Sequence, residues 1–191
     1  IALNPDFGQV ESDELVVNFS ASETFYSDKR PFFSENHSLF EVKGYNFFYV
    51  INTRRIGSAP DYNCAEYTGV LKTSCESNPL GVTDIDYAIR YTQQNENLDF
   101  GFLGASEADE KFSQGKDFYA FRTRKNADNY SIGYLGTYTE RPVLDRQATV
   151  HSVDLTYRPT DKVRIDTVLI TSNVDQGLDG TKTSGEPFRF R

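Results

Sequence analysis

The sequence predicts an all-β protein: an antiparallel up-and-down meander that forms part of an outer-membrane β-barrel. Short segments between Asp86 and Ser172 alternate large apolar residues with small or charged ones, which is the period of a β-strand. Tight and longer connections alternate between these segments, as they do in outer-membrane barrels. The segments also exceed the usual strand length of about 5–6 residues and approach the length that a tilted strand needs to cross a bilayer. A soluble meander whose connections alternate by chance is the alternative.

Residues 1–56 are expected to hold N-terminal strands and an inner or plug-like segment. Leu15–Ala21 and Asn46–Ile51 have the composition of strands. Between them, Lys29 and Arg30 precede a proline and two adjacent phenylalanines. In an extended segment, adjacent side chains point to opposite faces. Both phenylalanines can then be buried only if the segment is covered on both sides or lies inside a larger shell.

Residues 57–82 are expected to form a long loop, rich in Gly, Pro, Asn and Ser, that leaves the compact part of the chain. The loop contains both cysteines of the protein, Cys64 and Cys75, which we expect to pair under oxidising conditions. Two unrelated free thiols are the alternative. The two histidines, His37 and His151, are not near the cysteines in the sequence, which argues against a zinc site.

Residues 83–191 are expected to form the antiparallel meander, the barrel wall in this interpretation. Tyr130, Ile132 and Tyr134 share one face of their segment, while Ser131 and Gly133 lie on the other. In a soluble sheet the aromatic face is the core and the polar face meets water. In a membrane barrel the same alternation places the aromatic face in lipid and the polar face in a wet lumen. Periodicity alone does not distinguish the two.

Composition excludes several classes of function. The chain has 191 residues and a formal net charge of −8, which argues against a nucleic acid partner, because phosphate binding needs clustered Lys and Arg. A mean hydropathy of −0.56 and the lack of a long apolar run exclude a transmembrane helix, although they do not exclude a transmembrane barrel. The chain begins without an initiator Met, and we expect it to be a single domain that is a piece of something longer.

Three arginines and three carboxylates are the candidates for a ligand site or a charged lumen: Arg30, Arg54, Arg55, Asp6, Glu11 and Glu35. Arginine suits bidentate pairing with carboxylates. Such a cluster could hold a plug-like segment, or narrow a passage and make it selective. Ordinary structural salt bridges are the alternative.

No pattern in the sequence predicts catalysis. A glycosidase needs two carboxylates at a defined separation, which sequence does not show. The Gly-x-Ser-x-Gly signature and phosphate-cradling glycine loops are absent, and His151 lies inside a predicted strand. Asp175–Gly180 lacks the ligand spacing of an EF-hand. We therefore predict no catalytic residue, no metal site and no cofactor, and an enzymatic role is disfavoured.

Three ordered blocks resemble one family. Asn4–Glu11 reads NPDFGQVE, Lys29–Phe33 reads KRPFF, and Arg54–Gly57 reads RRIG. These are similar to the blocks NPDF-x-QVE, EKRPFF-x-E and SRRIG of the bacterial domain-of-unknown-function family numbered 5916. The chain departs from the family at block edges, with Ser27-Asp28 where Pro-Glu is usual and Asn52-Thr53 where Tyr-Ser is usual. The resemblance is expected to extend from residue 4 to about residue 175.

The resemblance implies a secreted protein of the Gram-negative outer membrane, with a C-terminal β-barrel and usually an N-terminal module similar to family 9 carbohydrate-binding domains. The implied partners are outer-membrane lipid, a carbohydrate, and other chains or missing strands that complete the sheet. The implied function is a barrel component for carbohydrate uptake or passage. A secreted or periplasmic glycan-acting hydrolase and a soluble β-sheet binding domain are the alternatives. The direction in which Tyr130, Ile132 and Tyr134 point separates these hypotheses.

Overall fold

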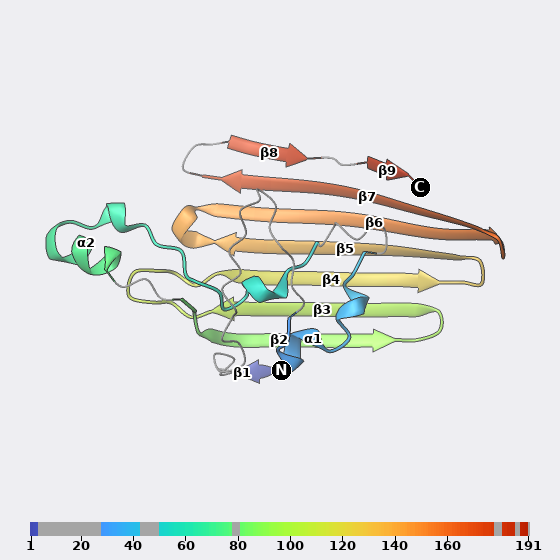
Figure 1. The fold of residues 1–191 in the computed structure, drawn as a ribbon, viewed down its shortest axis with the longest axis horizontal. Helices are drawn as coiled ribbons and strands as arrows, with labels where there is room; N and C mark the ends of the chain where they lie inside the picture. The colour runs from blue at the N-terminus through green and yellow to red at the C-terminus, as the bar shows by residue number, and fades with distance from the viewer. Residues whose placement is uncertain (4–27, 43–49, 78–80, 178–180, 186–187, 191) are drawn as a thin grey trace.

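The computed structural model describes residues 1–3, 28–42, 50–77, 81–177, 181–185 and 188–190. Its strands form one antiparallel sheet in the order β1 to β8, and β9 pairs with β7 beside β8 (Figure 1). The strands are β1 (Ala2–Leu3), β2 (Ile85–Gln94), β3 (Leu98–Glu107), β4 (Asp117–Asn126), β5 (Tyr130–Arg141), β6 (Arg146–Thr160), β7 (Val163–Gln176), β8 (Thr181–Gly185) and β9 (Phe188–Phe190). The predicted all-β antiparallel meander is confirmed. Within the described strands, no pairing joins the two ends of the sheet into a barrel.

The connections between strands differ at the two ends of the sheet. Residues 95–97, 127–129 and 161–162 form the turns at one end, where Ala127 N donates to Tyr130 O at 2.8 Å. Residues 108–116 and a turn containing the 3-10 helix η4 (Pro142–Leu144) lie at the other end (Figure 1). β7 continues to Gln176, beyond Ser172, where the last alternating segment of the sequence ends.

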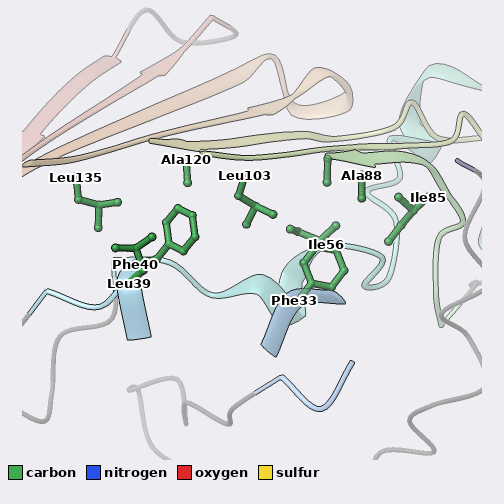
Figure 2. Close-up of a cluster of buried hydrophobic side chains, with 10 residues drawn as sticks. Phe33, Leu39, Phe40, Ile56, Ile85, Ala88, Leu103, Ala120 and Leu135 are labelled. Carbon is green, nitrogen blue, oxygen red and sulfur yellow. The ribbon is translucent and has the colours of Figure 1, made fainter. Parts of the chain in front are cut away.

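The sheet has one covered face and one bare face. The covered face carries small and charged residues together with a few aliphatic ones, and segments from the first sixty residues pack on it. Figure 2 shows Phe33, Leu39, Phe40 and Ile56 of these segments pointing at Ala88, Leu103, Ala120 and Leu135 of the sheet. A Cβ atom at Gly101 would lie only 2.8 Å from Leu39 and 2.9 Å from Phe40, so glycine permits this close approach.

The two adjacent phenylalanines lie in a helical turn, and the expectation of an extended segment is wrong. Pro31 is the first residue of helix α1 (Pro31–Ser34), where its fixed φ favours the helix and no N–H is missed. The 3-10 helix η1 (His37–Leu39) follows. The rings of Phe32 and Phe33 meet edge to face at 5.1 Å; Phe33 is a buried core residue and Phe32 packs, partly buried, against the same core. Of the predicted early strands, Leu15–Ala21 and most of Asn46–Ile51 lie outside the described residues.

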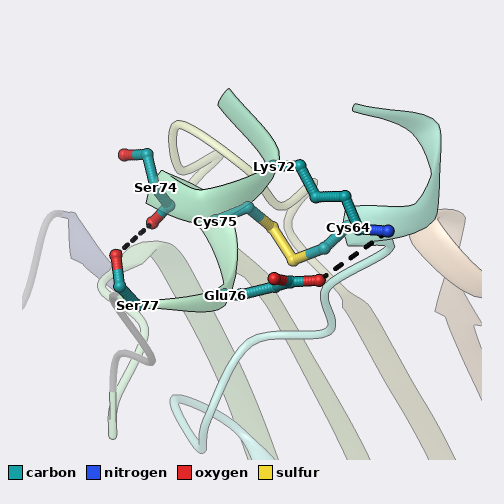
Figure 3. Close-up of a disulfide and its surroundings, with 6 residues drawn as sticks. All are labelled: Cys64, Lys72, Ser74, Cys75, Glu76 and Ser77. Atoms are coloured by element: carbon teal, nitrogen blue, oxygen red, sulfur yellow. Dashed lines mark hydrogen bonds and ion pairs between the residues drawn. A yellow bond between two sulfur atoms is a disulfide. The ribbon is translucent and has the colours of Figure 1, made fainter. Parts of the chain in front are cut away.

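The segment 57–82 carries a short helix that the sequence pattern does not reveal. The 3-10 helix η3 (Cys64–Glu66) and helix α2 (Gly69–Glu76) are joined by a Cys64–Cys75 disulfide with a Cα–Cα distance of 5.8 Å, which confirms the predicted pairing (Figure 3). Eight residues give too little periodicity to recognise, and the disulfide fixes the helix locally. Figure 1 shows α2 beyond the end of the sheet that carries the longer connections. Across the described ranges, no helix has both the length and the apolar character required to span a membrane.

We expect Gly101→Val to lower the free energy of unfolding by about 1–3 kcal/mol, because the new side chain would overpack the contact with Leu39 and Phe40. Chemical denaturation measures this change. Gly81→Ala is the control, since nothing lies within 4 Å of a Cβ atom there. Equal stabilities of the two variants would contradict the close approach.

Candidate functional site

A buried arginine lies at the centre of the covered face. Arg122 on β4 is fully buried and pairs with Asp154 on β6, with 3.0 Å between Nη2 and Oδ2. Its Nε donates to the carbonyl oxygen of Leu39 at 3.2 Å. A Cβ atom at Gly133, on the intervening β5, would lie 2.7 Å from both partners of the ion pair. Glycine at this position therefore lets the ion pair cross β5 and lets Arg122 reach the carbonyl group of Leu39.

Two further ion pairs extend the charged part of this face. Arg124 on β4 pairs with Asp99 on β3 at 2.7 Å. Arg90 on β2 donates to the carbonyl oxygens of Phe32 and Glu35, and lies 3.8 Å from the Glu35 carboxylate, which is exposed. The arginines of the sheet thus hold α1 and η1 through backbone carbonyl groups.

Arg30 joins two of the sequence blocks. It is buried, and its Nη2 pairs with Asp28 at 2.7 Å. Nη1 donates to Ile56 O and Nη2 donates to Thr53 O, each at 2.7 Å, so the KRPFF block is bonded to the turn η2 (Thr53–Arg55) and to Ile56. Burial raises the pKa of Asp28, but the hydrogen bonds and charge of Arg30 outweigh it, so that the pKa lies below its ordinary value.

A pocket of about 690 Å³ lies between residues 50–59 and the covered face of the sheet. Its apolar lining comes from both sides and includes Val50, Ile56, Leu103, Phe118 and Ala120. Its basic lining consists of Arg54, Arg55, Lys116, Arg141 and Arg146. No Asp or Glu belongs to the described lining, so the convergent carboxylate pair that a glycan hydrolase would need is not found there.

Two carboxylates outside the lining hold the basic groups in place. Glu107 lies 3.3 Å from Lys116 Nζ, and it also accepts from Gly57 N at 2.8 Å. Gly57 has a φ of +78°, a conformation that favours glycine. Arg141 Nε donates to Asp61 Oδ2 at 2.7 Å, which ties the 57–82 segment to β5. Burial raises the pKa of Asp61, but its hydrogen bond to Arg141 and the neighbouring positive charges bring it below the ordinary value.

The structure separates the six sequence-predicted candidates. Arg30 forms the buried ion pair with Asp28. Arg54 and Arg55 line the pocket, and Glu35 lies near Arg90. Asp6 and Glu11 lie outside the described residues. Sequence reasoning missed Lys116, Arg122, Arg141, Asp61 and Asp154. For Arg122 and Asp154, a signal was present: each is a charged residue on the same face of its strand as small residues such as Ala120 and Ser152. The described residues contain no cluster of three or more His, Cys, Asp or Glu that could hold a metal.

We expect Asp28→Asn to lower the free energy of unfolding by about 3–5 kcal/mol near neutral pH, because it leaves the buried Arg30 without its counter-charge. The folded-state pKa of Asp28 is below 3.8, so the ion pair stabilises the fold above that pH and the contribution is lost as the pH falls through the folded-state pKa. Denaturation between about pH 2 and 7 measures both effects. The control is Lys72→Gln, which removes an exposed pair on α2 and should change stability by less than about 0.5 kcal/mol. If the unfolding free energy of Asp28→Asn depended on pH as that of the wild type does, the pH-dependent stability would not come from Asp28.

Comparison with known proteins gives one match. The family described as Domain of unknown function (DUF5916) has a sequence model that matches residues 1–112, a shorter range than the resemblance predicts. No curated protein and no solved structure matches the chain. The matched range includes all three sequence blocks, the ion pair between Arg30 and Asp28, and strands β2 and β3. Because the match covers more than half of the sequence, the chain belongs to the DUF5916 family.

Proposed function

We propose that this chain forms part of the wall of an outer-membrane β-barrel in a Gram-negative bacterium, with α1, η1 and η2 on the luminal side. The observation that carries the proposal is that the polar face of the sheet is the covered one and the apolar face is the exposed one, the reverse of a soluble sheet. The charged and small residues are covered by the chain itself, whereas the aromatic and aliphatic residues of the other face are bare. Lipid outside and polar groups inside is the arrangement of a transmembrane barrel.

The bare face spans strands β2 to β7. Ile132 is 45% exposed and Tyr91 is 53% exposed. Other large side chains with more than a third of their surface exposed on this face include Ile89, Phe121, Tyr130, Val153, Leu155, Tyr157, Ile165 and Leu169. Their register places them on one surface, since Tyr130 opposes Tyr157 and Tyr157 opposes Ile165. A soluble β-domain predicts that this face is the closed core, and the described part of the chain does not bury it.

Energetics favour an apolar partner for this face. Leaving one large apolar side chain in water rather than burying it costs about 1.5–3 kcal/mol. Contiguous apolar patches on soluble proteins are therefore small and mark sites of protein or membrane contact. Strands of 10 to 15 residues in β2 to β7 also reach the length that a tilted strand needs to cross a bilayer.

In this proposal, further strands must join the two ends of the sheet, because open sheet edges do not occur in the hydrocarbon region. Such strands come from a longer chain or from partner chains. For the solute, the proposal takes carbohydrate, the class implied by the module usually attached in the family. The pocket beside the luminal segments is large enough for a small solute.

Tryptophan scanning in a tryptophan-free background tests the lipid contact directly: the 191 residues have no native Trp, and any Trp elsewhere in a longer chain is first replaced by Phe. The full-length variant Ile132→Trp, refolded into phosphatidylcholine vesicles, should show emission that is blue-shifted and quenched by lipids brominated on their acyl chains. Val70→Trp is the matched control: Val70 is 86% exposed on α2, outside the sheet, and its emission should be neither shifted nor quenched.

Unquenched emission from Ile132→Trp, in a protein that is folded and monodisperse without detergent, would disprove the membrane proposal. Equal quenching at both positions would also count against it, since α2 lies beyond the end of the sheet (Figure 1).

A further inference from the structure

Two arginines face each other at the pocket end of the sheet. Arg141, the last residue of β5, is the direct cross-strand partner of Arg146, the first residue of β6. Directly opposed side chains in an antiparallel pair have Cβ atoms about 4.5–5.5 Å apart, and like charges in such positions repel. Both arginines line the pocket. The fold therefore keeps an unfavourable pair of charges at the surface of a pocket.

Only one of the two arginines has a hydrogen-bonded counter-charge, although the charge of Arg146 also contributes to the lowered pKa of Asp61. Asp61 pairs with Arg141 through Nε and Nη2. In the part of the chain that the structure describes, no hydrogen bond or ion pair involves the half-buried side chain of Arg146. Lys116 is already paired with Glu107. Three cations thus lie near two carboxylates, and Arg146 is the one that makes no direct hydrogen bond or ion pair with either carboxylate.

We propose that this pocket binds a small organic anion whose carboxylate or phosphate group lies between Arg146 and the Nη1 side of Arg141. Nη1 is the edge of the Arg141 guanidinium that Asp61 does not use. Arginine pairs readily with planar or tetrahedral oxyanions through two hydrogen bonds. The bound anion neutralises Arg146 and removes the repulsion between the two arginines.

The rest of the pocket fits the body of such a ligand. The volume of about 690 Å³ lies within the range of about 300–1,000 Å³ that small-molecule sites occupy. Leu103, Ala120 and Ala148 supply apolar contact, and the described lining offers no carboxylate to repel an anion. Arg54 and Arg55 have contacts of their own and add positive charge to the lining without being assigned to the ligand.

The site is formed within one chain, so anion binding goes beyond the role in a barrel wall and does not require it. The test uses full-length protein in detergent at constant ionic strength, with three probes: D-glucuronate, inorganic phosphate and neutral D-glucose. Isothermal titration and thermal unfolding report binding. We expect glucuronate or phosphate to bind saturably and raise the unfolding temperature, and the stronger of the two identifies the anionic group. Glucose should do neither.

Variants locate the site. Arg146→Gln should weaken binding of the preferred anion at least about tenfold, since it removes a charge-assisted contact. Without anion, this variant should unfold at the wild-type temperature or above it, because the repulsion from Arg141 is gone. Arg158→Gln is the control: it removes an exposed arginine near the other end of β6 and should leave the affinity unchanged.

Three results would overturn the proposal: no saturable binding of either anion, binding of glucose as tight as that of glucuronate, or wild-type affinity in Arg146→Gln. A lower unfolding temperature of Arg146→Gln with unchanged affinity would identify Arg146 as a structural cation instead. The bromolipid measurement at Ile132→Trp is independent of these results, so failure of the anion site and failure of the membrane proposal are distinguishable.

Discussion

The buried guanidinium of Arg122 is the constraint on which the rest of the structure depends. A charged group removed from water costs several kcal/mol unless its partners are complete. Asp154 supplies the counter-charge across β5, and the Leu39 carbonyl supplies an acceptor from the covering segment. The sheet and its cover therefore satisfy one group together. A residue with a side chain at Gly133 would separate them, so the small residues of this face are as much a part of the contact as the charges.

Two of the three sequence blocks that resemble the family are parts of one contact. Arg30 of the KRPFF block donates to the carbonyl groups of Thr53, just before the RRIG block, and of Ile56, within it. Gly57, the last residue of that block, donates its N–H to Glu107 and so joins the contact to the end of β3. The physical reason for the two motifs is thus the attachment of the N-terminal segment to the sheet, with the pocket beside it.

The strands could be predicted because their alternation is local, as Tyr130, Ile132 and Tyr134 illustrate. Which face of the sheet is exposed could not be predicted, because the period of two is the same for a sheet in water and for a sheet in lipid. The turn at Pro31 was missed because a proline after charged residues suits an extended chain as well as the start of a helix. Arg54 and Arg55 were found through their motif, whereas the Arg141–Asp61 pair joins residues that are 80 positions apart, a distance over which local patterns carry no information.

The disulfide has a consequence for the order in which the molecule assembles. Cys64 and Cys75 are 11 residues apart, so closing this loop requires little loss of chain entropy. The contact between Arg122 and Leu39 spans 83 residues, so closing it costs more chain entropy than closing the disulfide loop. In an oxidising compartment, the disulfide between Cys64 and Cys75 can therefore form while the sheet is still unassembled. The strands would then pair while the disulfide-linked segment with α2 is already folded. That folded segment has to lie beyond the end of the sheet, where Figure 1 shows α2.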